Sequence, residues 1–358
     1  MRIQKATKKY EAWLGKNLTL VPADLALKHS RMAADAFQFL RATFYRWMQI
    51  WERASIDLAR APRVLAVGDL HVENFGTWRD KEGRLVWGIN DFDEAYPLPY
   101  SIDLVRLATS AILATAADHL ALSAADACHA ILTGYREGIE AGGKPLVLEE
   151  ENKWLREVAT GELRDPVHFW GKMSALASVH GEVPKGARRA LEESLPAPGL
   201  VYRVAHRVAG LGSLGRERYV ALTDWEGGRV AREAKALLPS ACFWAKDEHG
   251  AKEIFYEKIV TGAARCLDPF VRLRGRWIVR RLAPHCSRIE LASIPKQREE
   301  ERLLHSMGFE TANVHLGSKR AIKSVRRDLT RRKPGWLYES ASRMGDAVRK
   351  DWEEWRKG

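Results

Sequence analysis

Two carboxylates and one amide stand where the chain could present them to a common ligand. The stretch 66-AVGDLHVENFG-76 places Asp69 and Asn74 five residues apart after an apolar run, and 88-GINDFDEA-95 places Asp91 after a second one. Carboxylate and amide oxygens are the hard ligands that Mg²⁺ prefers, completed by water and substrate phosphates. Two of these groups could hold the metal while the third orients or deprotonates an attacking hydroxyl. This combination is typical of phosphoryl transfer.

Each of these residues has a simpler explanation when it is considered alone. An Asp that follows a strand often caps a turn. The sequence Gly-Asp-x-His, here with His71, also begins the metal site of calcineurin-like phosphoesterases, but the further motifs that such a site needs do not occur among the 11 histidines. All three residues together, with Asp103 shortly downstream, favour phosphoryl transfer.

A second motif, 210-GLGSLG-215, has the spacing G-x-G-x-x-G. A dinucleotide-binding fingerprint would open a helix here, whereas 216-RERYVALT-223 has the composition of a returning strand. We therefore expect the motif at a hairpin tip, where glycines could cover phosphates as they do in protein kinases. A plain flexible hairpin would have the same composition. The candidate phosphate-binding residues are Gly210, Gly212, Ser213 and Gly215.

Kinases add a lysine on the next strand and a carboxylate that holds it. Lys235 is the first candidate for that lysine, ahead of Arg232. Glu253 and Glu257 are one turn apart in an expected helix at 249–267, and we assign Glu257 to hold Lys235. The alternative is that both glutamates are solvated surface residues.

The elements that must position these residues alternate along the chain. Residues 1–62 have the apolar spacing of helices, a strand follows at 63–68, and 74–91 has the pattern of a hairpin. Helix signals dominate from 101 to about 198, and β-branched residues and glycine dominate after 199. The sequence therefore predicts an α+β protein.

The composition limits the classes of protein that remain. The 358 residues include 13 Trp and are 46% hydrophobic, enough for a sizeable core. The four cysteines form no CxxC pair, the first residues lack the apolar core of a signal peptide, and no apolar run has the length of a membrane span. We expect a cytoplasmic protein. The net charge of +12, with eight Lys or Arg in 318–333, favours an anionic ligand, although charge on a terminal helix is usually solvated surface.

The motifs together resemble known families. GDLHVEN, INDFDEA and SIDL are similar to the corresponding segments of aminoglycoside phosphotransferases and choline kinases, which are relatives of protein kinases. With RVAGLGSLGRERYV and KALLPSA, they resemble the bacterial family known as domain of unknown function 2252, from about residue 30 to the end of the chain. That family name supplies no reaction.

The kinase resemblance implies roles for the motif residues. Asp69 would be the catalytic residue that orients the acceptor hydroxyl, Asn74 and Asp91 would bind Mg²⁺, and Asp103 would brace the catalytic loop. The 210–215 glycines and Lys235 would bind the phosphates of ATP. Ala236 departs from the family pattern, which has a Glu there.

The order of these motifs is reversed relative to a kinase, in which the glycine-rich lobe comes first. We therefore expect a two-lobed, kinase-like fold that is circularly permuted, which costs little when chain ends lie close together. The expected segments are 1–62, N-terminal helices packing on the C-lobe; 63–198, the catalytic loop, metal motif and C-lobe helices; 199–290, a glycine-rich unit like an N-lobe; and 291–358, helices completing the C-lobe.

The predicted function is therefore ATP- and Mg²⁺-dependent phosphoryl transfer to an unidentified hydroxyl acceptor. Three alternatives remain open: a pseudokinase that binds nucleotide without catalysis, an enzyme that transfers AMP, and a basic nucleic-acid-binding protein with a structural Asp cluster.

Overall fold

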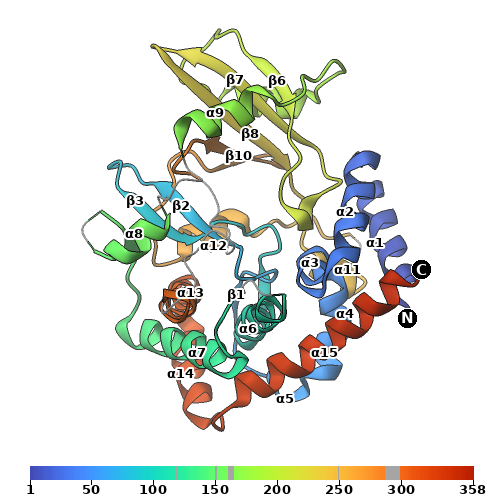
Figure 1. The fold of residues 1–358 in the computed structure, drawn as a ribbon, viewed down its shortest axis with the longest axis vertical. Helices are drawn as coiled ribbons and strands as arrows, with labels where there is room; N and C mark the ends of the chain where they lie inside the picture. Colours follow the sequence, from blue (N-terminus) through green and yellow to red (C-terminus); the bar gives the residue numbers. More distant parts are fainter. Residues whose placement is uncertain (118–119, 150, 160–164, 249, 287–298) are drawn as a thin grey trace.

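Five helices at the start of the chain form one side of a helical body (Figure 1). The computed structural model of the protein describes residues 1–117, 120–149, 151–159, 165–248, 250–286 and 299–358. The helices are α1 (Ile3–Asn17), α2 (Pro22–Ala34), α3 (Ala36–Ala42), α4 (Phe44–Ala54) and α5 (Ile56–Ala59). In α4, Phe44, Trp47, Met48 and Trp51 recur at spacings of three and four and are buried. The prediction of helices in residues 1–62 is confirmed.

Two small antiparallel sheets follow and set the positions of the first motif. Strand β1 (Arg63–Ala66) pairs with β4 (Tyr96–Pro99), and β2 (Phe75–Arg79) forms the expected hairpin with β3 (Leu85–Ile89), to which β5 (Leu146–Val147) adds. Phe75 lies opposite Ile89, and the Asn90 amide donates to the Asn74 carbonyl oxygen at 3.0 Å. The start of one strand and the end of the other therefore meet, which brings Asn74 and Asp91 to the same edge.

Three helices fill the centre of the body. They are α6 (Ser101–Ala116), α7 (Ala124–Ala141) and α13 (Glu299–His315), and α6 is buried over most of its length. The backbones of α7 and α13 approach each other very closely, because a Cβ on Gly134 would lie 1.9 Å from the His305 carbonyl oxygen and one on Gly308 would lie 2.0 Å from that of Ile131. Glycine is required at this crossing.

A five-stranded antiparallel sheet forms the other end of the molecule, at the top of Figure 1. The strand order is β6-β7-β8-β10-β9, and helix α9 covers one face, where Met173 packs with Val220 and Leu282. The elements here are α9 (Pro166–Ser174), α10 (Lys185–Glu192), β6 (Arg203–His206), β7 (Arg218–Trp225), β8 (Gly228–Ala236), β9 (Arg272–Arg274) and β10 (Trp277–Leu282), whereas α8 (Lys153–Ala159) lies beside the β2–β3 hairpin (Figure 1). The β-rich character expected after residue 199 is confirmed, and the returning strand expected at 216–223 corresponds to β7.

Between β8 and β9 the structure differs from the expected helix at 249–267. A short α11 (Ala241–Ala245) is followed by α12 (Tyr256–Gly262), so Glu253 lies outside the helix. His249, within the expected range, lies outside the described residues. Phe255 is buried directly before α12, as are Tyr256 and Ile259 within it. The polar start of the expected helix has no comparable apolar face, and it remains a loop.

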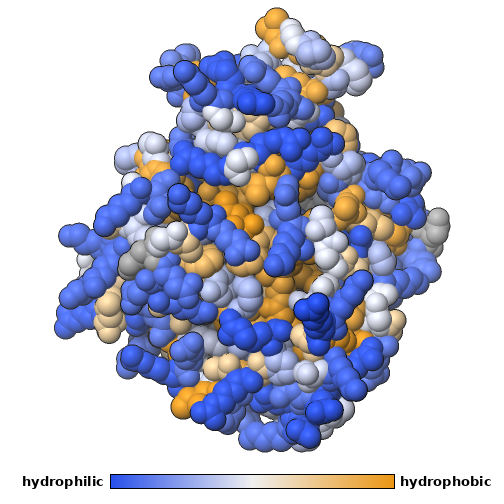
Figure 2. Space-filling model, turned by 180° about the vertical axis from the view of Figure 1, so that it is seen from behind, coloured by the Kyte–Doolittle hydropathy of each residue, from blue (hydrophilic) through white to orange (hydrophobic). Residues whose placement is uncertain are grey.

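The chain ends beside its beginning. Helices α14 (Ile322–Arg331) and α15 (Trp336–Arg356) complete the body, and Gln4 donates a side-chain hydrogen bond to the Glu354 carbonyl oxygen at 2.8 Å, so the two termini lie side by side (Figure 1). On the face shown in Figure 2, hydrophobic side chains gather between the sheet and the helical body, with polar residues around them. Among the described residues, no helix has the length and apolar character needed to cross a membrane.

Candidate functional site

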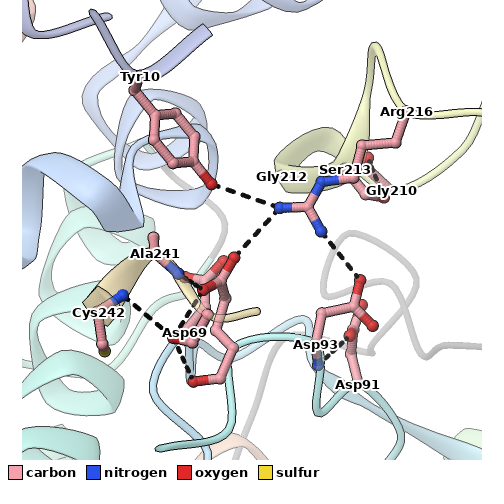
Figure 3. A network of polar contacts seen from close by, with 12 residues as sticks. Tyr10, Asp69, Asp91, Asp93, Gly210, Gly212, Ser213, Arg216, Ala241 and Cys242 are labelled. Atoms are coloured by element: carbon pink, nitrogen blue, oxygen red, sulfur yellow. Dashed lines mark hydrogen bonds and ion pairs between the residues drawn. The ribbon is translucent and has the colours of Figure 1, made fainter. Parts of the chain in front are cut away.

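One cavity of about 80 Å³ brings the two motifs together. Its walls come from the segment after β1, the segment after β3, the glycine-rich turn and the N-terminal helices. The predicted site residues that line it are Asp69, Asn74, Asp91, Gly210, Gly212 and Ser213. Residues separated by more than a hundred positions in the sequence thus share one site, part of which is drawn in Figure 3.

Asp103 fixes the loop that carries Asp69. Its carboxylate accepts hydrogen bonds from the amides of Val67 at 2.7 Å and Gly68 at 2.9 Å, and His315 lies 2.9 Å away on the other side. Asp103 and His315 have no exposed surface. This is the position from which Asp103 can brace the loop, as the resemblance implies. His315 serves this buried network and does not line the cavity.

The Arg106 guanidinium binds the Asp69 carboxylate. Its Nε donates to Asp69 Oδ1 at 2.9 Å and its Nη2 makes a second, short contact to the same oxygen. The guanidinium lies over the rings of Phe44 and Trp47, at 5.1 and 4.9 Å from their centroids. Burial raises the pKa of Asp69 to about 7, although Arg106 acts in the opposite direction. Asp69 is therefore oriented and is poised to exchange a proton near neutral pH.

Asn74 is fixed by the loop in which it stands. Its side-chain Nδ2 donates to the Asp69 carbonyl oxygen at 2.9 Å, and its main-chain amide donates to the His71 carbonyl oxygen at 2.8 Å. Since Nδ2 is the donating atom, Oδ1 is the atom that a metal could use.

Asp91 and Asp93 share Lys235, but their pKa values are shifted in opposite directions. Lys235 Nζ lies 2.5 Å from Asp93 Oδ2 and 3.7 Å from Asp91 Oδ2. Burial would raise the pKa of Asp91, but Lys235 and Arg280 hold it below its usual value. Burial and the neighbouring Asp91 charge raise the pKa of Asp93 to about 6. Asp91 lines the cavity as an ionised carboxylate, with 39% of its side chain exposed.

The glycine-rich turn packs directly on this loop. It joins the paired strands β6 and β7 as a short 3-10 turn, η2 (Leu211–Ser213), so the expected hairpin position is confirmed. A Cβ on Gly212 would lie 3.1 Å from the Arg41 carbonyl oxygen and 3.4 Å from Asp69 Oδ2. Gly215 has φ +93° and its carbonyl oxygen accepts from the Val21 amide at 2.9 Å. The turn is therefore anchored to α2 while it covers Asp69.

Sequence reasoning missed several charged residues that lie at the cavity, among them Lys28, Arg216 and Glu94. Lys28 of α2 is buried and donates to the Gly212 carbonyl oxygen at 3.1 Å, and burial, with Arg216 nearby, lowers its pKa to about 8. Arg216 lies between the Tyr10 hydroxyl and Asp93 (Figure 3), and its Nη2 is 3.2 Å from Glu94. Glu94 also accepts from the Ala241 amide at 2.6 Å.

The assignment of Glu257 requires a correction. Its Oε1 accepts a hydrogen bond from the Leu273 amide at 3.3 Å at an exposed position, whereas Lys235 pairs with Asp91 and Asp93. The helix α12 that carries Glu257 is short, and its buried face presents Tyr256 and Ile259 instead. Lys235 is thus held by the segment after β3 and not by a helix.

Any metal here would rely on few protein ligands. Within the described residues, no group of three or more His, Cys, Asp or Glu side chains is arranged to hold a metal ion. Asn74 and Asp91 nevertheless offer oxygen atoms at one cavity, and Mg²⁺ usually keeps several waters and takes only one or two carboxylates from the protein. This donor set fits a magnesium ion that is completed by phosphates.

Comparison with known proteins decides the family. The family model described as "Uncharacterized protein conserved in bacteria (DUF2252)" matches residues 20–169 and 175–358. The chain belongs to this family. The DUF2252 match covers Asp69, Asn74, Asp91 and the glycine-rich turn, so the whole cavity except its Tyr10 wall lies within the family region. No curated protein and no solved structure matches the chain.

Proposed function

We propose that this DUF2252 protein transfers the γ-phosphoryl group of ATP to a hydroxyl acceptor, with Mg²⁺ as cofactor. The observation that supports this most is the shared cavity, in which the Asp69–Asn74 loop, Asp91 and the glycine-rich turn face one another. Phosphoryl transfer needs positioning and charge neutralisation more than covalent chemistry from the protein. Two carboxylates, an amide and the lysine and arginine side chains that line the cavity can supply both.

The roles follow from the chemistry of the three side chains. Asp69, with a pKa of about 7, would orient the acceptor hydroxyl and accept its proton. Asn74 and Asp91 would hold Mg²⁺, whose charge would offset that of the phosphate oxygens. Asp91 suits this role because its pKa is held low by Lys235 and Arg280 against the effect of burial, and it remains ionised.

The five-stranded sheet supports a kinase-like fold. Its glycine-rich turn joins the first and second strands, and Lys235 stands on the third, where protein kinases carry the phosphate-binding lysine. We propose that this sheet corresponds to a kinase N-lobe and the helical body to a C-lobe, in permuted order. The adjacent termini support such a permutation.

The cavity is small in this structure. Its volume, about 80 Å³, is well below the roughly 300–1,000 Å³ of pockets that enclose drug-sized ligands. ATP binding would therefore require the 210–215 turn to move away from Asp69. Such a movement would break the hydrogen bond between Lys28 and Gly212 and free the Lys28 ammonium for an anionic ligand.

A thermal-unfolding titration with ATP, with and without Mg²⁺, tests the proposal. At a hundred times the dissociation constant, ATP should stabilise the wild type by about 2.7 kcal/mol. Asp91→Asn should lose the Mg²⁺-dependent part. The control Asp346→Asn, at an exposed position paired with Arg349, should keep it. Equal responses from wild type and Asp91→Asn would count against the metal site.

Labelled ATP separates the alternatives. Label that appears on an acceptor from the γ-phosphate supports phosphoryl transfer, whereas label from the α-phosphate indicates AMP transfer. Nucleotide binding without either product would indicate a pseudokinase. If the wild type does not respond to ATP, salt-dependent binding of DNA or RNA becomes the measurement to make.

A further inference from the structure

A second cavity lies on the other side of the segment that carries Asp91. It holds about 60 Å³ and is enclosed by the β2–β3 hairpin, α12 and the end of β10. Asn90 lines both this cavity and the first one. Three arginines line it, and we call it the arginine pocket: Arg265, Arg280 and Arg281.

Each arginine is held in place while leaving nitrogen atoms without a partner. Arg265 lies over the rings of Trp78 and Phe92, at 4.5 and 4.9 Å from their centroids, and its Nη2 donates to the Ile89 carbonyl oxygen at 2.8 Å. Arg281 lies 4.2 Å from the Phe270 centroid. In these three side chains, the buried guanidinium nitrogens without a hydrogen-bond partner among the described residues are Arg265 Nε and Nη1, Arg280 Nε and Nη2, and Arg281 Nε.

The nearby carboxylates do not complete this set. Glu233 Oε1 is 3.7 Å from Arg280 Nε, beyond hydrogen-bond distance, and it is already bound by Arg218 at 3.0 Å. Asp268 Oδ1 accepts from the Phe270 amide, and burial raises the pKa of this carboxyl. Burial also lowers the pKa of Arg265, as expected for a cation with too little compensating charge. Among the described residues, the guanidinium donors of the pocket therefore outnumber the acceptors within hydrogen-bond distance, although Glu233, Asp91 and Asp93 lie close enough to raise the pKa of Arg280.

We infer that the arginine pocket binds a phosphate group. A guanidinium group can donate two parallel hydrogen bonds to the oxygens of one phosphate group. Such a partner also removes the free-energy cost of leaving buried charged donors without hydrogen bonds. The volume of about 60 Å³ compares with about 30 Å³ for one water molecule in the liquid. It therefore has room for a phosphate group. Its source could be free phosphate or the phosphate of a larger molecule whose remainder extends outside.

Thermal unfolding of the full chain with inorganic phosphate, at constant ionic strength balanced by chloride, tests this site. The wild type should show a saturable rise in Tm, and Arg281→Gln should lose it. The control Arg229→Gln, on the same sheet at an exposed position, should keep it. Lys28→Gln, which changes the first cavity, should also keep it.

Three results would overturn the inference: no saturable response in the wild type, equal losses in Arg281→Gln and Arg229→Gln, or a response removed by Lys28→Gln and kept by Arg281→Gln. If Arg281→Gln does not fold, Arg281→Lys can replace it in the test, because lysine retains the positive charge but lacks the paired donors of a guanidinium group. It should weaken phosphate binding at least tenfold, and an unchanged dissociation constant would again overturn the site. A second titration with glycerol phosphate identifies the source, because tighter binding than inorganic phosphate indicates a phosphate carried by a larger molecule.

Discussion

Arg106 is paired with Asp69 inside the protein, through the bond from its Nε to the Asp69 Oδ1 at 2.9 Å. The arginine has no exposed surface, and it stands on the buried helix α6 one turn after Asp103, which braces the same loop. One helix thus sets both the backbone and the side-chain orientation of the proposed catalytic residue.

Removing the cation from this pair should destabilise the protein. Arg106→Met removes the buried cation that pairs with Asp69, whose side chain is 18% exposed, and breaking a fully buried pair on one side typically costs up to about 3–5 kcal/mol. Urea unfolding should show a loss of that size. Arg53→Met, at an exposed position of α4, should change stability by less than about 0.5 kcal/mol. Equal effects of the two changes would mean that the buried pair contributes no special stability.

The raised pKa of Asp69 makes its contribution to stability depend on pH. The folded protein holds this proton up to a pH of about 7, whereas the unfolded chain releases it near 3.9. The resulting stabilisation is complete below the unfolded value and is lost as the pH rises through about 7. The Tm of the wild type minus that of Asp69→Asn should therefore fall between pH 4 and pH 8. A difference that stays constant over this range would show that Asp69 has an ordinary pKa.

Gly68 should tolerate substitution less well than another glycine of similar conformation. Both Gly68 and Gly83 have positive φ, +83° and +77°, so Ala costs about 1–2 kcal/mol at either position. A Cβ on Gly68 would also lie 2.5 Å from the Glu94 carbonyl oxygen, whereas nothing lies within 4 Å at Gly83. Gly68→Ala should therefore lower the free energy of unfolding more than Gly83→Ala. Losses of the same size in denaturant would contradict the predicted steric clash.

Lys235 and Glu257 should behave very differently when they are changed. Lys235→Met removes the cation shared by Asp91 and Asp93, so we expect a loss of about 3–5 kcal/mol and no response to Mg²⁺ and ATP. Glu257→Gln changes an exposed side chain that contacts only the Leu273 amide in its hydrogen bonds among the described residues. Unfolding and ATP titrations of Glu257→Gln should match the wild type. A strong effect of this variant would restore the assignment that the sequence favoured.

The sequence predicted the local parts of the site well. Asp69, Asn74 and Asp91 each follow or precede a short apolar strand, and the register of β2 with β3 brings Asn74 and Asp91 to the same edge. The position of the glycine-rich turn between paired strands was also predictable, because the residues on both sides have strand composition.

The contributions of distant helices were not predictable from periodicity. Lys28 and Tyr10 reach the cavity only because α1 and α2 fold back over the glycine-rich turn. Arg106 did carry a signal, since a single arginine in the apolar run 104-LVRLATSAIL-113 has to find a buried partner. Glu257 was misassigned because the strength of a helix pattern does not reveal where the helix starts or which face it buries.

The meeting of the two chain ends means that the backbone is almost a ring. Because Gln4 bonds to Glu354, a short peptide could join the ends, and the ring could then be opened at the exposed residues near Gly199. The resulting polypeptide would run from the glycine-rich sheet through α13–α15 and the N-terminal helices to Asp69 and Asp91. Every contact of the cavity would be retained, but the ribosome would now synthesise the glycine-rich turn before the segments that carry Asp69 and Asp91.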